Sequence, residues 1–197
     1  MQVTAGTPAG TVSDGRLVPI TILNPLKPWG PAWLHVLFFL ARHIDAVFNS
    51  KIRRLAFIHF ARWTVLPREL PGGAPGRSPQ RLRQQYLLFE SNFNGDWAEY
   101  LDSFAYAIPW RIRWVWSSTY GFPGPTPTEP FKESIRTNDF AADYYYCAYP
   151  DASVSMILSA VALDRALPEV IARVDQVDAR TFRAEFDAFL TRHQRLL

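Results

Sequence analysis

The chain lacks several features that would assign it to a class at once. Its 197 residues include a single cysteine, Cys147, which excludes an internal disulfide and favours a reducing, cytoplasmic compartment. No apolar run reaches the roughly 18 to 20 residues that a membrane-spanning helix needs, and the longest, 32–41, is interrupted by His35. Residues 1–15 show no basic stretch followed by an apolar core, so we expect no signal peptide.

Charge and sequence signatures exclude further classes. The formal net charge is only +3 with His neutral, and the absence of a long block of like charge argues against a nucleic-acid partner. The sequence contains no GxSxG, HExxH, P-loop or GxGxxG motif. Its 4 histidines never occur at the i, i+4 spacing of a zinc-binding helix, so we expect no metal site.

What the chain does have is aromatic side chains, at 15% of all residues with Trp 7 and Phe 14. Such a composition suits a thick core, an aromatic-lined pocket or a membrane-facing surface. The stretch Trp110–Trp116 (WRIRWVW) places indoles beside Arg111 and Arg113. Three interpretations stay open: a membrane interface, an aromatic wall with an arginine that binds anions, and a core helix whose arginines extend to solvent.

Three runs alternate in the manner of β-strands, whose successive side chains point to opposite faces. They are Leu55–Leu66, Tyr86–Phe93 and Asp143–Tyr149. In the first run the alternation groups Trp63 with His59. One face of the resulting sheet is predicted to gather the polar and reactive side chains, namely His59, Glu90, Asn92, Tyr145, Cys147 and Tyr149.

The remaining elements follow from hydrophobic periodicity and from turn and cap signals. Asp96, with Glu99 three residues later, is typical of a helix N-cap, and Pro109 should interrupt the helix that follows. The expected strand is Leu17–Asn24, and the expected helices are Pro31–Asn49, Trp97–Ile108, Trp110–Ser117, Phe131–Arg136, Ser153–Leu167, Pro168–Val177 and Ala179–Leu197.

In order, these elements are β-α-β-β-α-β followed by helices, which predicts an α+β fold, the ferredoxin-like plait. We expect the sheet order 4-1-3-2, with two helices on one face and the other face open. Over Leu17–Tyr149 the element order resembles the dimeric α+β barrel superfamily, which implies a homodimer with a pocket inside each barrel. We therefore predict a flexible tail over 1–16 and a single domain over 17–197, with a plait core over 17–150 and a helical extension over 151–197.

The candidate chemistry lies on the predicted open face. A carboxylate beside an imidazole fixes its tautomer and raises its basicity, so His59 is the expected base and Glu90 its orienting partner. The alternative is a buried histidine, with Glu90 paired to an arginine. Tyr145 completes the predicted catalytic set. The predicted substrate-binding residues are Asn92, Trp63, Cys147, Tyr149 and Arg62.

The sequence thus predicts a small enzyme that acts on an apolar or aromatic metabolite by acid/base chemistry, as an isomerase, cyclase or cofactor-free oxygenase would. We expect no cofactor, and the alternative left open is a haem bound by His59. The alternative functions are a non-catalytic lipid- or ligand-binding protein at a membrane surface, with Phe38, Phe39 and Trp110–Trp116 in contact with lipid, and an interaction subunit.

Overall fold

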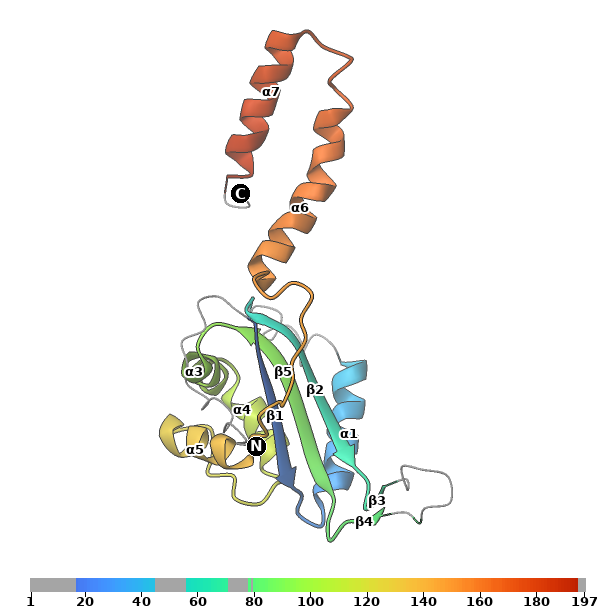
Figure 1. Cartoon of the computed structure of the whole chain (residues 1–197), viewed down its shortest axis with the longest axis vertical. Coiled ribbons are helices and arrows are strands. Elements are labelled where there is room, and N and C mark those ends of the chain that lie inside the picture. The colour runs from blue at the N-terminus through green and yellow to red at the C-terminus, as the bar shows by residue number, and fades with distance from the viewer. Residues whose placement is uncertain (1–16, 45–55, 71–77, 79, 195–197) are drawn as a thin grey trace, which may run out of the picture. The chain divides into compact units, whose positions relative to one another are not determined.

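The computed structural model describes residues 17–44, 56–70, 78 and 80–194. The chain divides into two compact units, Met1–Asp151 and Ala152–Leu197, each of which is described by itself. The first is a mixed α+β unit, built from a three-stranded antiparallel sheet and helices that pack against it (Figure 1).

The sheet has the order β1-β5-β2, with β5 in the centre and antiparallel to both neighbours. The strands are β1 (Leu17–Pro25), β2 (Ile58–Leu66) and β5 (Tyr86–Asn94). Two further strands, β3 (Glu69–Leu70) and β4 (Gln80–Arg81), pair with each other in a separate two-stranded sheet. Along β5 every second residue from Leu87 to Phe93 is buried, which is the period of a strand that covers a core on one face.

A β-bulge at His59 interrupts the pairing between β2 and β5. Beyond the bulge, Arg62 lies directly opposite Glu90, and Trp63 lies directly opposite Phe89. Directly paired residues share a face, so Arg62 and Trp63 lie on opposite faces. The prediction that Trp63 shares the face of Glu90 is therefore wrong, because the extra residue of the bulge shifts the alternation by one.

The helices of this unit pack on the face of the sheet that carries Phe89. They are α1 (Gly30–His43), α3 (Trp97–Ala107), α4 (Pro109–Trp116) and α5 (Thr128–Asn138). The predicted N-cap is confirmed, since the Asp96 side chain accepts hydrogen bonds from the N–H groups of Ala98 and Glu99. Pro109 separates α3 from α4, as expected. Residues 45–49 of the predicted first helix lie outside the described residues.

Most of the core lies between the sheet and α3, α4 and α5. The rings of Phe93 and Tyr100 stack with centroids 3.8 Å apart, and both side chains are buried. Burial raises the pKa of Tyr100 well above its usual range. The core reaches the outer helix α5, where the Lys132 ammonium donates to Asp102 Oδ2 at 2.8 Å and to Glu129 Oε1 at 3.2 Å. The hydrogen bond to Asp102 is the largest contribution that raises the pKa of Lys132.

The segment 139–150 contains no strand, so the predicted strand Asp143–Tyr149 is wrong. Directly after α5 the chain pairs briefly with the edge of β1, where the Phe140 N–H donates to the Thr21 carbonyl at 2.8 Å. It then crosses the open face of the sheet as irregular backbone (Figure 1). The strand fails to form for a physical reason. The three consecutive tyrosines of Tyr144–Tyr146 would place aromatic rings on both faces of a strand. Such a pattern specifies no buried face, and a strand needs one to fix its register.

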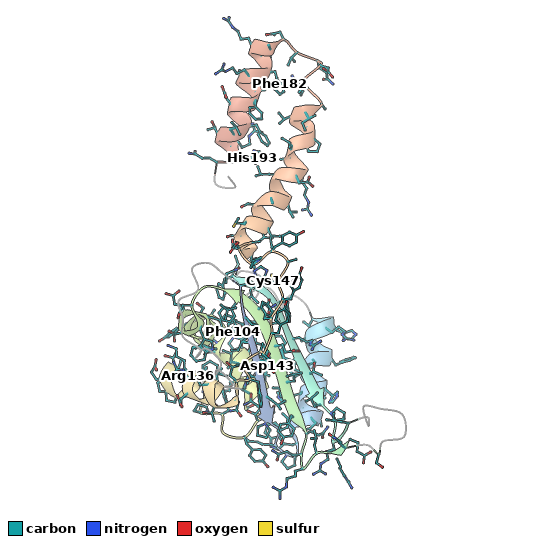
Figure 2. All side chains as sticks on the ribbon, viewed as in Figure 1. Phe104, Arg136, Asp143, Cys147, Phe182 and His193 are labelled. Atoms are coloured by element: carbon teal, nitrogen blue, oxygen red, sulfur yellow. The ribbon has the colours of Figure 1, made fainter. Side chains whose placement is uncertain are left out.

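The second unit consists of two helices, α6 (Val154–Ile171) and α7 (Ala179–Arg192). Helix α6 runs through Pro168, so the predicted division into two helices at that residue is wrong. The Ser153 side chain accepts a hydrogen bond from the Met156 N–H in the first turn of α6, and the Asp178 side chain accepts from the Arg180 and Thr181 N–H groups in the first turn of α7. Between the helices, Arg173 Nη2 donates to Glu185 Oε1 at 2.8 Å. Figure 2 labels Phe182, which begins a row of stacked rings that Phe186 and Phe189 continue.

Phe93, one ring of the stacked pair, should contribute several kcal/mol to the stability of the first unit, about 3–5 kcal/mol for a buried Phe. We expect Phe93→Ala to lower the free energy of unfolding by about 3–5 kcal/mol, because the removed ring is fully buried and leaves a cavity. The matched control is Phe39→Ala on α1, where the ring is 62% exposed and the expected change is within about 0.5 kcal/mol. Urea unfolding followed by circular dichroism measures both, and equal losses would contradict this description of the core.

Candidate functional site

The open face of the sheet carries an ion pair in its centre. Arg62 Nε donates to Glu90 Oε2 at 2.8 Å, and Arg62 Nη2 donates to the same oxygen. The arginine side chain is mostly exposed, so solvent screening makes this a weak contact. Glu90 is therefore engaged by an arginine, which is the alternative that the sequence left open, and no hydrogen bond joins it to His59 among the described residues.

His59 lies at the bulge and has a different partner. Its Nε2 is 2.8 Å from Asn94 Oδ1, and because an amide oxygen only accepts, the imidazole donates there. The neutral ring then carries its basic lone pair on Nδ1. A haem iron bound at Nε2 would have to displace Asn94. The sequence analysis does not include Asn94 among the site residues, because the pair Asn94-Gly95 is typical of a turn, whereas Asn94 is the last residue of β5.

The segment over the open face contributes the next pair. Asn92 Nδ2 of β5 donates to the Tyr145 hydroxyl at 2.7 Å. Burial raises the pKa of Tyr145, and the nearby Cys147 thiol adds to this rise, so the phenol stays protonated at neutral pH. Cys147 is half-buried, and Figure 2 labels it on this segment together with Asp143. Tyr149 is 77% exposed and does not join the pair.

Trp63 lies on the helix-covered face, in a cluster that we call the aromatic trio and that consists of Trp63, Phe89 and Trp116. The ring of Phe89 lies 5.1 Å from that of Trp63 and 5.3 Å from that of Trp116, measured between centroids. The trio joins β2, β5 and α4. It is held in place by the Trp116 indole N–H, which donates to the buried Asn24 Oδ1 of β1 at 3.2 Å.

Against this trio the structure contains a cavity of about 120 Å³, which we call the α1–α4 cavity. Its floor is Trp63 of β2, and its walls come from α1, α3 and α4. The lining is almost entirely apolar, with one charged side chain. The lining residues are Leu37, Phe38, Ala41, Trp63, Phe104, Ile108, Arg111, Ile112, Trp114, Val115 and Trp116.

The polar groups of this lining are hydrogen-bond donors. Arg111 is only 8% exposed, and its guanidinium carbon lies 4.3 Å from the centre of the Trp110 ring. Desolvation by burial lowers the pKa of Arg111, although an arginine stays charged at any physiological pH. The Trp63 indole Nε1 is buried and donates to no acceptor among the residues that the structure describes. A ligand that fits this lining would be apolar and would carry an acceptor or an anion.

The first turn of α1 is fixed to the end of α4, which sets the width of the cavity. The Trp33 indole N–H donates to the Trp114 carbonyl at 2.7 Å, and the Lys27 ammonium donates to the Ser117 carbonyl at 2.8 Å. Gly30 is required for this approach, because a Cβ built there would lie 2.8 Å from the Ser118 carbonyl oxygen. The α1 residues that line the cavity, Leu37, Phe38 and Ala41, come after this first turn along the helix.

Neither a metal site nor a membrane-spanning helix is found in the described part of the chain. No three His, Cys, Asp or Glu side chains gather there as a metal site would require. No helix within the same ranges combines the length and the apolar character needed to cross a bilayer.

Comparison with known proteins gives no match of any kind. No family model, no curated protein and no solved structure matches this chain. The function proposed for this protein therefore rests on the contacts, burial and charges of its own residues.

The structure divides the predicted site residues into separate groups. Arg62 with Glu90, and Asn92 with Tyr145, lie together on the open face, whereas Trp63 lines a cavity on the other face. Their roles in catalysis or binding stay predictions. The α1 residues that line the cavity were not among the predicted site residues. One of the three sequence interpretations makes Arg111 an anion-binding group, on the evidence of arginines placed among the tryptophans of Trp110–Trp116.

The hydrogen bond between Asn92 and Tyr145 should hold the crossing segment on the sheet. We expect Tyr145→Phe to accelerate amide exchange at Phe140 several-fold, since a hydrogen bond contributes about 0.5–1.5 kcal/mol and exchange follows local opening. The matched control is Tyr144→Phe, which removes the same atom from an 83% exposed ring. Native-state hydrogen exchange followed by NMR measures both variants. If they exchange at the same rate, this hydrogen bond does not fix the segment.

Proposed function

We propose that this protein binds a small apolar molecule with one anionic group, such as an aromatic or short-chain carboxylate, in the α1–α4 cavity. The observation that carries the proposal is the buried Arg111 in an otherwise apolar lining. This proposal develops the ligand-binding alternative, which assigns the contacts to Phe38, Phe39 and Trp110–Trp116 at a membrane surface, and it replaces that surface with a cavity that Phe38 and Trp114 line.

The size of the cavity supports a ligand of this kind. An apolar cavity of about 150 Å³ accommodates a benzene ring, and one water occupies about 30 Å³ of the liquid. The α1–α4 cavity, with about 120 Å³, therefore suits one small ring or a short alkyl chain. Ring faces from Trp63 and Phe38 are available to such a group, and their own rings lie 6.5 Å apart between centroids.

The donors in the lining support the choice of an anion. An ion pair in a desolvated site is stronger than one at the surface, and the planar guanidinium can donate two parallel hydrogen bonds to a carboxylate. A neutral ligand of the same shape would offer the guanidinium no opposite charge. The proposed site therefore distinguishes a carboxylate from the corresponding alcohol.

An acid/base enzyme on the open face is the second candidate. It is favoured by the polar contacts that converge there, in which the protonated Tyr145 phenol lies beside Asn92 and Cys147. It ranks second because His59 and Glu90 each have a different partner. The order β1-β5-β2 also supports a plait-like relationship, in which irregular backbone would replace the fourth strand and a second copy would complete the barrel.

The proposed site can be tested with two probes of one shape, 3-phenylpropanoate and 3-phenyl-1-propanol. We expect isothermal titration calorimetry to show tighter binding of the carboxylate. In Arg111→Met the carboxylate should bind about tenfold more weakly or worse, because a hydrogen bond to a charged group contributes about 1.5–3 kcal/mol. Binding of the alcohol should change little in that variant. Equal affinity for both probes in the unmodified protein would contradict the role of Arg111.

A second pair of variants tests the location. Ala41→Phe fills the cavity from α1 and should abolish binding of both probes. Ala32→Phe makes the same change at an exposed position of the same helix and should leave binding intact. Circular dichroism confirms that both variants are folded. If folded Ala41→Phe binds the carboxylate as well as Ala32→Phe does, the ligand lies elsewhere, and the open face becomes the first candidate.

A further inference from the structure

The outer side of α1 carries an apolar stripe that the core does not use. Trp33, Val36, Leu40 and Ile44 follow one another at spacings of three, four and four residues, so they lie on one side of the helix and its immediate end. Each of these side chains is between 39% and 54% exposed. We call them the α1 stripe. It lies outside the residues that line the α1–α4 cavity.

Helix α4 extends the α1 stripe with two indoles. Trp33 donates its indole N–H to the Trp114 backbone, which places the two residues side by side. The Trp114 ring is 39% exposed and meets the Trp110 ring edge-on, with centroids 4.5 Å apart. Trp114 also lines the α1–α4 cavity, so the apolar surface borders the proposed binding site.

The charged side chains on these two helices have one sign. Neither helix contains an aspartate or a glutamate, and the cations they carry are Arg42, Arg111 and Arg113. Lys27 lies just before α1, with its ammonium 5.7 Å from the centre of the 51% exposed Trp29 ring. Tryptophans with adjacent cations and no carboxylates are complementary to the interfacial region of an anionic lipid layer, where the indoles enter the headgroup level and the cations attract the lipid charge.

We infer that α1 and α4 together dock on an anionic lipid surface. The α1 stripe and the indoles of Trp110 and Trp114 enter the headgroup region, while Arg113 and Lys27 contact lipid phosphates or carboxylates. A membrane suits this face better than a second copy of the chain does. A second copy would bring the same cations against each other, whereas anionic lipid neutralises them. The inference stands on the surface of the helices and does not require the cavity to hold a ligand.

The test is flotation of the purified full chain with two kinds of vesicle, one of phosphatidylcholine alone and one that also contains about 30% phosphatidylserine. The anionic vesicle imitates the negative charge of a cytoplasmic leaflet. We expect flotation with the anionic vesicles at low salt, and its loss as added salt shortens the Debye length. Arg113→Gln should weaken the binding about fivefold, the contribution of one cation near such a surface.

A pair of double variants locates the docking face. Val36→Glu with Leu40→Glu introduces two carboxylates into the α1 stripe and should abolish flotation. Phe140→Glu with Tyr144→Glu makes a matched change at two exposed aromatic positions of the segment that follows α5 and should leave flotation intact. Both pairs replace exposed side chains, and circular dichroism confirms their folding.

Three outcomes would overturn the inference. The first is the absence of flotation with anionic vesicles at low salt. The second is equal flotation of the two double variants, which would place the contact elsewhere. The third is sedimentation as a dimer that Val36→Glu with Leu40→Glu dissociates, in a protein that does not float, because the α1 stripe would then bind a second copy.

Failure of the lipid inference can be distinguished from failure of the proposed function. The cavity-filling variant Ala41→Phe should lose 3-phenylpropanoate and keep flotation, because Ala41 lines the cavity and is not part of the α1 stripe. Val36→Glu with Leu40→Glu should keep 3-phenylpropanoate and lose flotation. If Ala41→Phe loses both, the surface and the cavity are not independent, and the inference as stated is wrong.

Discussion

The contact on which the first unit depends is the packing of Trp116 against Phe89 and Trp63. It joins α4 to two strands, and the hydrogen bond from the Trp116 indole to Asn24 adds the third strand. Two of these rings, Trp63 and Trp116, also form part of the wall of the α1–α4 cavity. A cluster that holds the helices against the sheet therefore also shapes the proposed site, and the cavity persists because α1 is fixed at its first turn, where Gly30 lies against Ser118.

Much of the fold could be predicted from local sequence signals. Alternation identifies β1, β2 and β5 because each has one apolar parity that covers the core, and Asp96 marks the start of α3 because its side chain accepts from the first free N–H groups. Those signals are local, and they act through a few neighbouring residues. The α+β class follows from them. The observed strand order β1-β5-β2 also corresponds to the order 1-3-2 that the expected plait gives to its first three strands.

The rest depends on contacts that the sequence does not display. The bulge at His59 has no glycine or proline to mark it, and it alone decides that Arg62 and not Trp63 lies beside Glu90. The tyrosines of Tyr144–Tyr146 favour a strand by propensity, but they provide no buried face, so the chain crosses the sheet without pairing regularly. The cavity could not be predicted either, because residues of several elements line it together, and sequence periodicity describes each helix alone.

The central claim is that the α1–α4 cavity, and not the open sheet face, is the binding site. Intermolecular nuclear Overhauser effects between bound 3-phenylpropanoate and the protein test this claim most directly. Our account predicts contacts from the phenyl protons to the Val115 methyl groups, the Leu37 methyl groups and the Trp63 ring, all of which line the cavity. Contacts to Phe60 and Tyr145 on the open face, with none to Val115, would contradict it.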